Sequence, residues 1–181
     1  MTERPILFSG PMVRAILEGR KTMTRRVIKL QPTGAADVQY RVAAAVTMPV
    51  SGRQQVCPYG RVGDHLWVRE TWAPHAWPPT GPSYQYAADD QYPAPERWRP
   101  SIHMPRAASR ITLEVLNVRV ERLHDISEED AKAEGVTLKG TSRYDGEARD
   151  AFEALWCGIN GAESWDANPW VWVIWFRVIK P

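Results

Sequence analysis

The stretch GRKTMTRR, residues 19–26, follows a segment whose apolar residues recur at helical spacing. Gly19 is a suitable residue to end that helix, because glycine adopts the left-handed backbone geometry found just past helix C-termini. Lys21 and Thr24 therefore lie immediately beyond a predicted helix. Residues 24–30 mix β-branched and basic side chains, which favours a strand. The basic segment is thus expected at the junction of a helix and a strand.

The rest of the chain has the pattern of several strands with short helices outside them. Strands are predicted at residues 6–8, 65–71, 110–123 and 170–179, and further helices at 127–134 and 146–158. The alternation in the third of these strands changes phase at Leu116 and Asn117, which indicates a bulge or tight turn. Because the helices do not alternate regularly with strands, a small antiparallel barrel fits this order better than a parallel sheet.

Two stretches interrupt this pattern. Residues of about 31–60 are poorly patterned, and those of about 74–100 are rich in proline and aromatic residues. Both are too long for ordinary connections, so we interpret them as insertions, the second as a lid or flap. The expected organisation is a single α+β domain over residues 1–181 that carries two long insertions.

Length and composition indicate a globular protein. The chain has 181 residues, of which 44% are hydrophobic and 24% charged, close to the average for folded domains. No apolar run is long enough to span a membrane, and the first residues lack the pattern of a signal peptide. Two cysteines form neither a disulfide framework nor a zinc site. We therefore expect a cytoplasmic protein with no membrane partner.

Positive charge is concentrated in one segment. The net charge is only +2, but residues 14–29 carry six basic side chains against the single acid Glu18. Such a cluster points to a localised anionic ligand such as phosphate, and it is equally consistent with a solvated basic face.

Lys21 and Thr24 form the first candidate pair for chemistry. A threonine hydroxyl is a poor nucleophile unless a base takes its proton, and a lysine serves as that base where burial or nearby cations lower its pKa. Arg20, Arg25 and Arg26 are such cations. From the residues alone, such a pair in a basic turn is more often a solvent-exposed surface feature than a catalytic pair.

Three further residues have both a structural and a functional interpretation. Glu134 ends an acidic helix and is either solvated or a site carboxylate, and Glu70 is either a strand salt bridge or a site carboxylate. Histidine side chains in general change charge near neutral pH, so His103 suits a site, although a buried, hydrogen-bonded histidine is the commoner case. The histidines and cysteines lack metal-ligand spacing, so we expect no metal and no cofactor.

The segment at residues 19–26 resembles the Gly-x-Lys-x-x-Thr-x-Arg signature of the ASCH domain, a member of the PUA-like superfamily. Residues 63–68, GDHLWV, resemble the Gly-Asp-x-Leu-x-Val strand of that family, residues 126–136 its short acidic helix, and residues 171–178 its closing strand. Residues 100–106 and 168–170 resemble a subgroup found in bacteriophages and prophages. The resemblance covers most of the chain outside the two insertions.

This resemblance implies a small PUA-like β-barrel whose cleft takes a base or nucleoside. One bacterial branch of the family hydrolyses N4-acetylcytidine with a lysine, a threonine and a glutamate. These residues correspond to Lys21, Thr24 and, if the helix is aligned without a gap, Glu134. Other ASCH-like proteins are thought to bind or cut RNA.

Two functions follow as hypotheses, and a phage assembly factor with a vestigial cleft is a third. The first is an amidohydrolase acting on a modified nucleoside, with Lys21 as base, Thr24 as nucleophile and Glu134 as acid or base. The second is a module that binds RNA or a modified base without catalysis. In either case we assign ligand binding to Arg20, Arg25, Arg26, Glu70 and His103. The enzyme is favoured, because a lysine, threonine and glutamate together exceed what phosphate binding requires.

Overall fold

The structure is a computed structural model, which describes residues 1–29, 31, 40–42, 45–50, 53–75, 84–89, 95–137 and 147–179. The predicted α+β class is confirmed. The helices are α1 (Gly10–Leu17), α2 (Glu128–Ala133) and α3 (Glu147–Asn160). The strands are β1 (Glu3–Leu7), β2 (Met23–Val27), β3 (Tyr40–Val42), β4 (Ala45–Val50), β5 (Arg53–Val56), β6 (His65–Arg69), β7 (Trp72–Pro74), β8 (Tyr84–Tyr86), β9 (Thr112–Arg122) and β10 (Trp170–Ile179).

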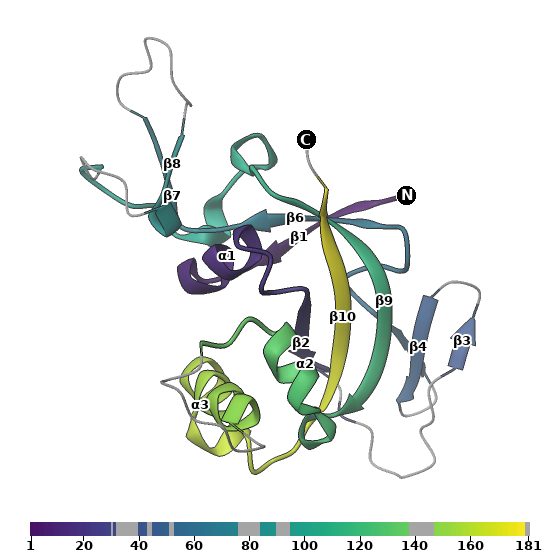
Figure 1. The fold of residues 1–181 in the computed structure, drawn as a ribbon. Coiled ribbons are helices and arrows are strands. Elements are labelled where there is room, and N and C mark those ends of the chain that lie inside the picture. Colours follow the sequence, from purple (N-terminus) through teal and green to yellow (C-terminus); the bar gives the residue numbers. More distant parts are fainter. Residues whose placement is uncertain are drawn as a thin grey trace.

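A five-stranded sheet in the order β1-β6-β9-β10-β2 forms the centre of the fold. Strand β1 runs parallel to β6, and the other neighbours are antiparallel. Figure 1 shows the long, curved β9–β10 pair, with the helices to one side of it in this view and β3 and β4 to the other. The core therefore forms around this pair.

The sheet is open, so the closed barrel expected from the sequence does not form. In the described part of the chain, no backbone pairing joins the two edge strands, β1 and β2. Helix α1 connects these strands, and a side chain spans the gap between them. The guanidinium of Arg26 donates from Nη2 to the carbonyl of Leu7 at 2.6 Å. A side-chain contact thus takes the place of a backbone ladder.

The predicted bulge in β9 is confirmed. Trp175 of β10 pairs with Asn117, and the next residue, Phe176, pairs with Val115. Leu116 is therefore left without a partner in the ladder, and its side chain is exposed. The change of phase keeps apolar residues facing the core on both sides of the bulge.

Strand β10 is buried on both faces, which explains its nearly continuous apolar sequence. Trp172, Ile174 and Phe176 pack in the cluster that includes α1. Val171 and Val173 pack in a second cluster beneath α2 and α3. Helix α1 thus covers one face of the sheet near β2, and helices α2 and α3 cover the other.

The three helices agree with the sequence pattern. Pro11 occupies the first turn of α1, and Gly19 just past its end has φ +73°. Ser127 caps α2 by accepting a hydrogen bond from the Asp130 amide at 3.1 Å. Within the described residues, the helices are too short or too polar to cross a membrane.

The predicted insertions contain strands that their sequences did not indicate. Strands β3, β4 and β5 form an antiparallel sheet within the first, and β7 and β8 form a hairpin at the second. These strands are short, so alternation gave little signal. Much of both insertions, including residues 32–39, 76–83 and 90–94, lies outside the described residues, and with them most of the predicted lid or flap.

Candidate active site

The turn after α1 docks against the end of α2 through backbone contacts. The amide of Lys21 donates to the carbonyl of Ala15, and the amide of Thr22 donates to the carbonyl of Ala133, both at 2.9 Å. A backbone bridge also links Lys21 to Glu134. Residues more than 100 positions apart are thereby brought together.

Gly135 allows this close approach. Its φ is +80°, a conformation that costs little only for glycine. A Cβ atom at this position would lie 2.7 Å from the Cβ of Lys21 and 3.0 Å from that of Ala15. The absence of a side chain therefore lets the end of α2 rest directly on Lys21.

Lys21 is buried, and its ammonium group is fully hydrogen-bonded. Nζ lies 2.7 Å from each of three acceptors: the carbonyl of Met23, the carbonyl of Glu134 and Oε2 of Glu134. A lysine has three N–H donors, so none remains free. Burial lowers the pKa of Lys21 from its ordinary value, against the opposing effect of the Glu134 carboxylate. A lowered pKa is the property that a lysine base requires.

Thr24 lies close to this pair on β2. Thr24 is only 4% exposed, and it lines the same cavity as Lys21 and Glu134. Its hydroxyl is not a partner of Lys21 Nζ, and it makes no hydrogen bond to the described residues. The hydroxyl is therefore available to a ligand.

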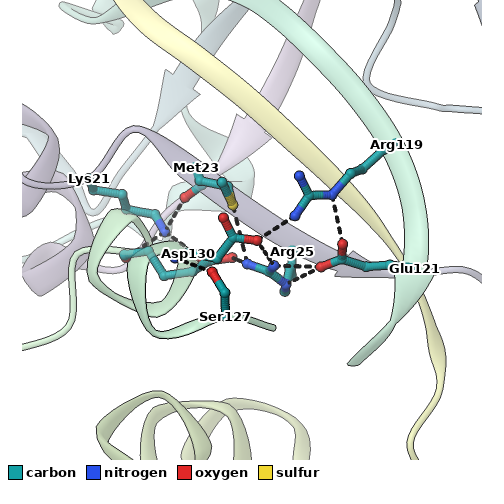
Figure 2. Close-up of polar contacts among 8 residues, drawn as sticks. Lys21, Met23, Arg25, Arg119, Glu121, Ser127 and Asp130 are labelled. Atoms are coloured by element: carbon teal, nitrogen blue, oxygen red, sulfur yellow. Dashed lines mark hydrogen bonds and ion pairs between the residues drawn. The ribbon is translucent and has the colours of Figure 1, made fainter. Parts of the chain in front are cut away.

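Arg25 is enclosed by carboxylates (Figure 2). Nε and Nη2 donate to Glu121, Nη2 also donates to Asp130, and Nη1 donates to Oε1 of Glu134 and to the sulfur of Met23. These contacts use all five N–H donors of the guanidinium. Its side chain is fully buried, so the donors expected to bind a ligand are engaged within the protein.

Arg26 points to the opposite face of β2, because side chains alternate along a strand. Its guanidinium lies 5.1 Å from the centre of the Phe8 ring. Its Nε is buried and has no hydrogen-bond acceptor, and no carboxylate of the described residues lies within ion-pair distance. Arg26 thus has no ion-pair partner among the described residues, and the Glu134 carboxylate acts on its charge from a longer distance.

A cavity of about 510 Å³ lies between the end of β1, the start of α1, strand β2 and helix α3. Lys21, Thr24, Arg26 and Glu134 are among the polar residues that line it. The apolar and aromatic part of the wall consists of Leu7, Phe8, Met12, Val27, Tyr59, Phe152, Leu155, Trp156 and Ile159. The cavity combines an apolar and aromatic wall with a few polar side chains, as small-molecule sites do. As expected from the sequence, Lys21 and Thr24 line the same cavity as Glu134.

Three predicted binding residues lie elsewhere. Arg20 is exposed and pairs with Glu18 and the carbonyl of Gly135. Glu70 is buried and accepts two hydrogen bonds from Arg110, at 2.9 and 3.0 Å. His103 is exposed and does not line the cavity, although its neighbour Ser101 does. The arrangement of Glu70 corresponds to the salt-bridge alternative.

The wall formed by α3 was not predicted as part of a site. Phe152, Leu155 and Trp156 lie in the predicted helix at residues 146–158, and they also border the cavity. An apolar helix face that covers a core and one that covers a ligand have the same spacing. Among the described residues, no group of three His, Cys, Asp or Glu side chains is arranged to hold a metal ion.

Comparison with known proteins adds no relative: no protein-family model, curated protein or solved structure matches this chain.

Proposed function

We propose that this chain is an ASCH-type hydrolase that cleaves the amide bond of an N4-acylated cytidine-type nucleoside. The observation that carries the proposal is the meeting of Lys21, Thr24 and Glu134 at one aromatic-walled cavity. These residues come from two distant segments, and a buried lysine beside a free hydroxyl is an arrangement suited to covalent catalysis.

The reaction begins with a proton transfer inside the Lys21–Glu134 pair. When a ligand excludes water, the proton of Nζ passes to Oε2 of Glu134, 2.7 Å away, and leaves a neutral amine and a carboxylic acid. The amine then accepts the Thr24 proton while Oγ1 attacks the acyl carbonyl. Arg26 stabilises the negative charge that develops on the carbonyl oxygen.

Collapse of this intermediate breaks the amide bond. Glu134 returns its proton to the departing N4 amine, and the acyl group remains as an ester on Thr24. Water then attacks the ester, with Glu134 as its general base, and Lys21 returns the proton to the Thr24 oxygen. Glu134 then passes the proton taken from water to Lys21, 2.7 Å away, which restores the ammonium–carboxylate pair. The products are cytidine and a carboxylic acid.

The charges favour a single nucleoside over an RNA chain. Arg20 and Arg25, which a phosphate clamp would use, are engaged with carboxylates or carbonyl groups of the protein. The cavity volume of about 510 Å³ is in the range of small-molecule sites. Leu7, Val27 and Ile159 in its wall are exposed apolar residues, which suit a base better than a phosphate backbone.

Incubation with a panel of N4-acylated and other modified nucleosides, followed by mass detection of products, tests the proposal. We expect release of the free nucleoside from at least one N4-acyl substrate. Thr24→Val should retain ligand affinity and lose turnover, whereas Thr24→Ser, which keeps a hydroxyl, should retain part of it. Turnover by Thr24→Val at the wild-type rate would exclude Thr24 as the nucleophile.

A binding module is the second candidate, and one observation favours it. All three donors of Lys21 are already satisfied, as in a structural ion pair. A module of this kind would bind one of the panel compounds in calorimetry and release no product from any of them.

A further inference from the structure

We propose that Arg25 is a positioning residue, which holds Glu134 and thereby sets how readily Lys21 gives up its proton. It makes no contact with the ligand. This inference rests on the proposed function only where it treats Lys21 as the base. Although Arg25 forms part of the cavity wall, its side chain is fully buried and its N–H donors are occupied.

The two oxygens of the Glu134 carboxylate bind two different cations. Oε2 accepts from Lys21 at 2.7 Å, and Oε1 accepts from Arg25 Nη1 at 3.3 Å. Because both oxygens are engaged, the carboxylate has a defined orientation. Because its charge is shared, it stabilises the Lys21 ammonium less than it would as the partner of Lys21 alone.

Arg25 is held on its other side by two carboxylates from different elements. Glu121 of β9 lies 2.5 Å from Nη2, and Asp130 of α2 lies 2.7 Å from the same nitrogen. The ring of Phe152 on α3 lies 5.9 Å from the guanidinium carbon. Figure 2 shows Arg25 between Glu121 and Asp130. These contacts hold the guanidinium in place and prevent it from turning towards a ligand.

The charged groups that face Lys21 determine whether the loss of Arg25 raises or lowers the pKa of Lys21. Glu134 stabilises the ammonium form, whereas Arg25 and Arg26 destabilise it, and the Phe8 ring lies 5.7 Å from Nζ. Removing the charge of Arg25 removes its repulsion of the Lys21 ammonium. The Glu134 carboxylate then has only Lys21 as an ion-pair partner. The pKa of Lys21 should then rise, and Lys21 should keep its proton to higher pH.

A lysine NMR titration tests this without any substrate. The chain has five lysines, so the side-chain signal of Lys21 is identified by its absence from the Lys21→Arg spectrum. We expect the Lys21 midpoint in the wild-type protein to lie below those of the exposed lysines. In Arg25→Gln the midpoint should move to higher pH by about one unit or more. Arg25→Lys, which keeps the charge, should shift it less.

Arg119→Gln is the matched control. Arg119 also pairs with Glu121 and Asp130, but it does not contact Glu134. Its replacement removes one cation from the same carboxylates and should leave the Lys21 midpoint near the wild-type value. An unchanged midpoint in Arg25→Gln, or an equal shift in Arg119→Gln, would overturn the proposal.

If Arg25→Gln does not fold, the comparison of Arg25→Lys with Arg119→Lys decides instead. A Lys21 midpoint that moves in Arg25→Lys but not in Arg119→Lys supports the proposal. Equal Lys21 midpoints in the two variants contradict it. Since the midpoint is measured in the free protein, failure of this inference is distinct from failure to find a hydrolysable nucleoside.

Discussion

Gly135 supports the geometry of the site through its left-handed backbone conformation and its lack of a side chain. Gly135→Ala would combine a left-handed φ with a clash against Lys21, whereas Gly19→Ala would have a similar φ of +73° and nothing within 4 Å of the new Cβ. Both changes should cost about 1–2 kcal/mol of unfolding free energy from backbone strain. We expect Gly135→Ala to cost more and to impair the site as well.

Urea unfolding and ligand binding measured side by side check this. Gly19→Ala should bind ligand as the wild-type protein does. Equal losses of stability in the two variants, with intact binding in both, would mean that Gly135 does not support Lys21.

The two cysteines differ in reactivity. Cys57 is buried, and burial raises the pKa of its thiol to about 12, whereas Cys157 is partly exposed. Because the thiolate is the reactive form, one thiol per native chain should react rapidly with a thiol reagent at mildly alkaline pH, and two in denaturant. Peptide mass mapping should locate the fast reaction at Cys157. Rapid modification of Cys57 in the native protein would contradict the packing described around it.

Arg25 and Arg26 illustrate what could be predicted from the sequence at this scale. The basic segment and its Lys21–Thr24 pair were identified, but both arginines were assigned to the ligand. They lie on opposite faces of β2, and Arg25 is paired with carboxylates 96, 105 and 109 residues away. Alternation along the predicted strand was a signal that could have separated the two side chains. The distant carboxylates could not be inferred, because they meet Arg25 only through the sheet pairing.

At the scale of elements, Arg110 connects the β7–β8 hairpin region to the central sheet. It pairs with the buried Glu70, and with Asp89 at 2.6 Å just after β8. Arg110→Met would leave Glu70 as an unpaired buried carboxylate, which should cost about 3–5 kcal/mol. Arg177→Met removes the exposed pair with Glu114 and should cost about 0–1 kcal/mol. Chemical denaturation of both variants checks the difference.

The cost of Arg110→Met should also depend on pH. Burial raises the pKa of Glu70, although Arg110 opposes this effect. Without Arg110 that pKa should rise further, so the folded protein binds the Glu70 proton more tightly than the unfolded chain does. The destabilisation should therefore be small at acidic pH and grow as the pH rises. A penalty that is constant with pH would indicate lost packing instead of an unpaired charge.

Individual elements were predicted to different extents. The helices, the long strands and the bulge at Leu116 followed from periodicity and from glycine, proline and serine positions, which act locally. Strands β3, β4 and β5 were missed because each is short and depends on pairing with its neighbours. The open edge between β1 and β2 was also missed, since closure depends on what occupies the gap and not on any single strand.

For the whole molecule, β10 is a strand that contributes buried side chains to both of the larger apolar clusters. Trp172 is 1% exposed and lies in the cluster shared with α1, whereas Trp67 on β6 is only partly buried. Trp172→Ala should cost about 3–5 kcal/mol, and Trp67→Ala distinctly less. Thermal unfolding of the two variants checks this. Equal losses would mean that the packing around β10 is not central to stability.

The central claim is that the cavity carries out chemistry with Lys21 as its base. The most direct test is to measure turnover and ligand affinity together in Lys21→Arg, after its unfolding transition has been shown to match that of the wild-type protein. Arginine keeps the positive charge but does not readily lose a proton. The variant should bind the substrate with nearly unchanged affinity and lose about a hundredfold or more in turnover. Full hydrolytic activity in Lys21→Arg would contradict the account.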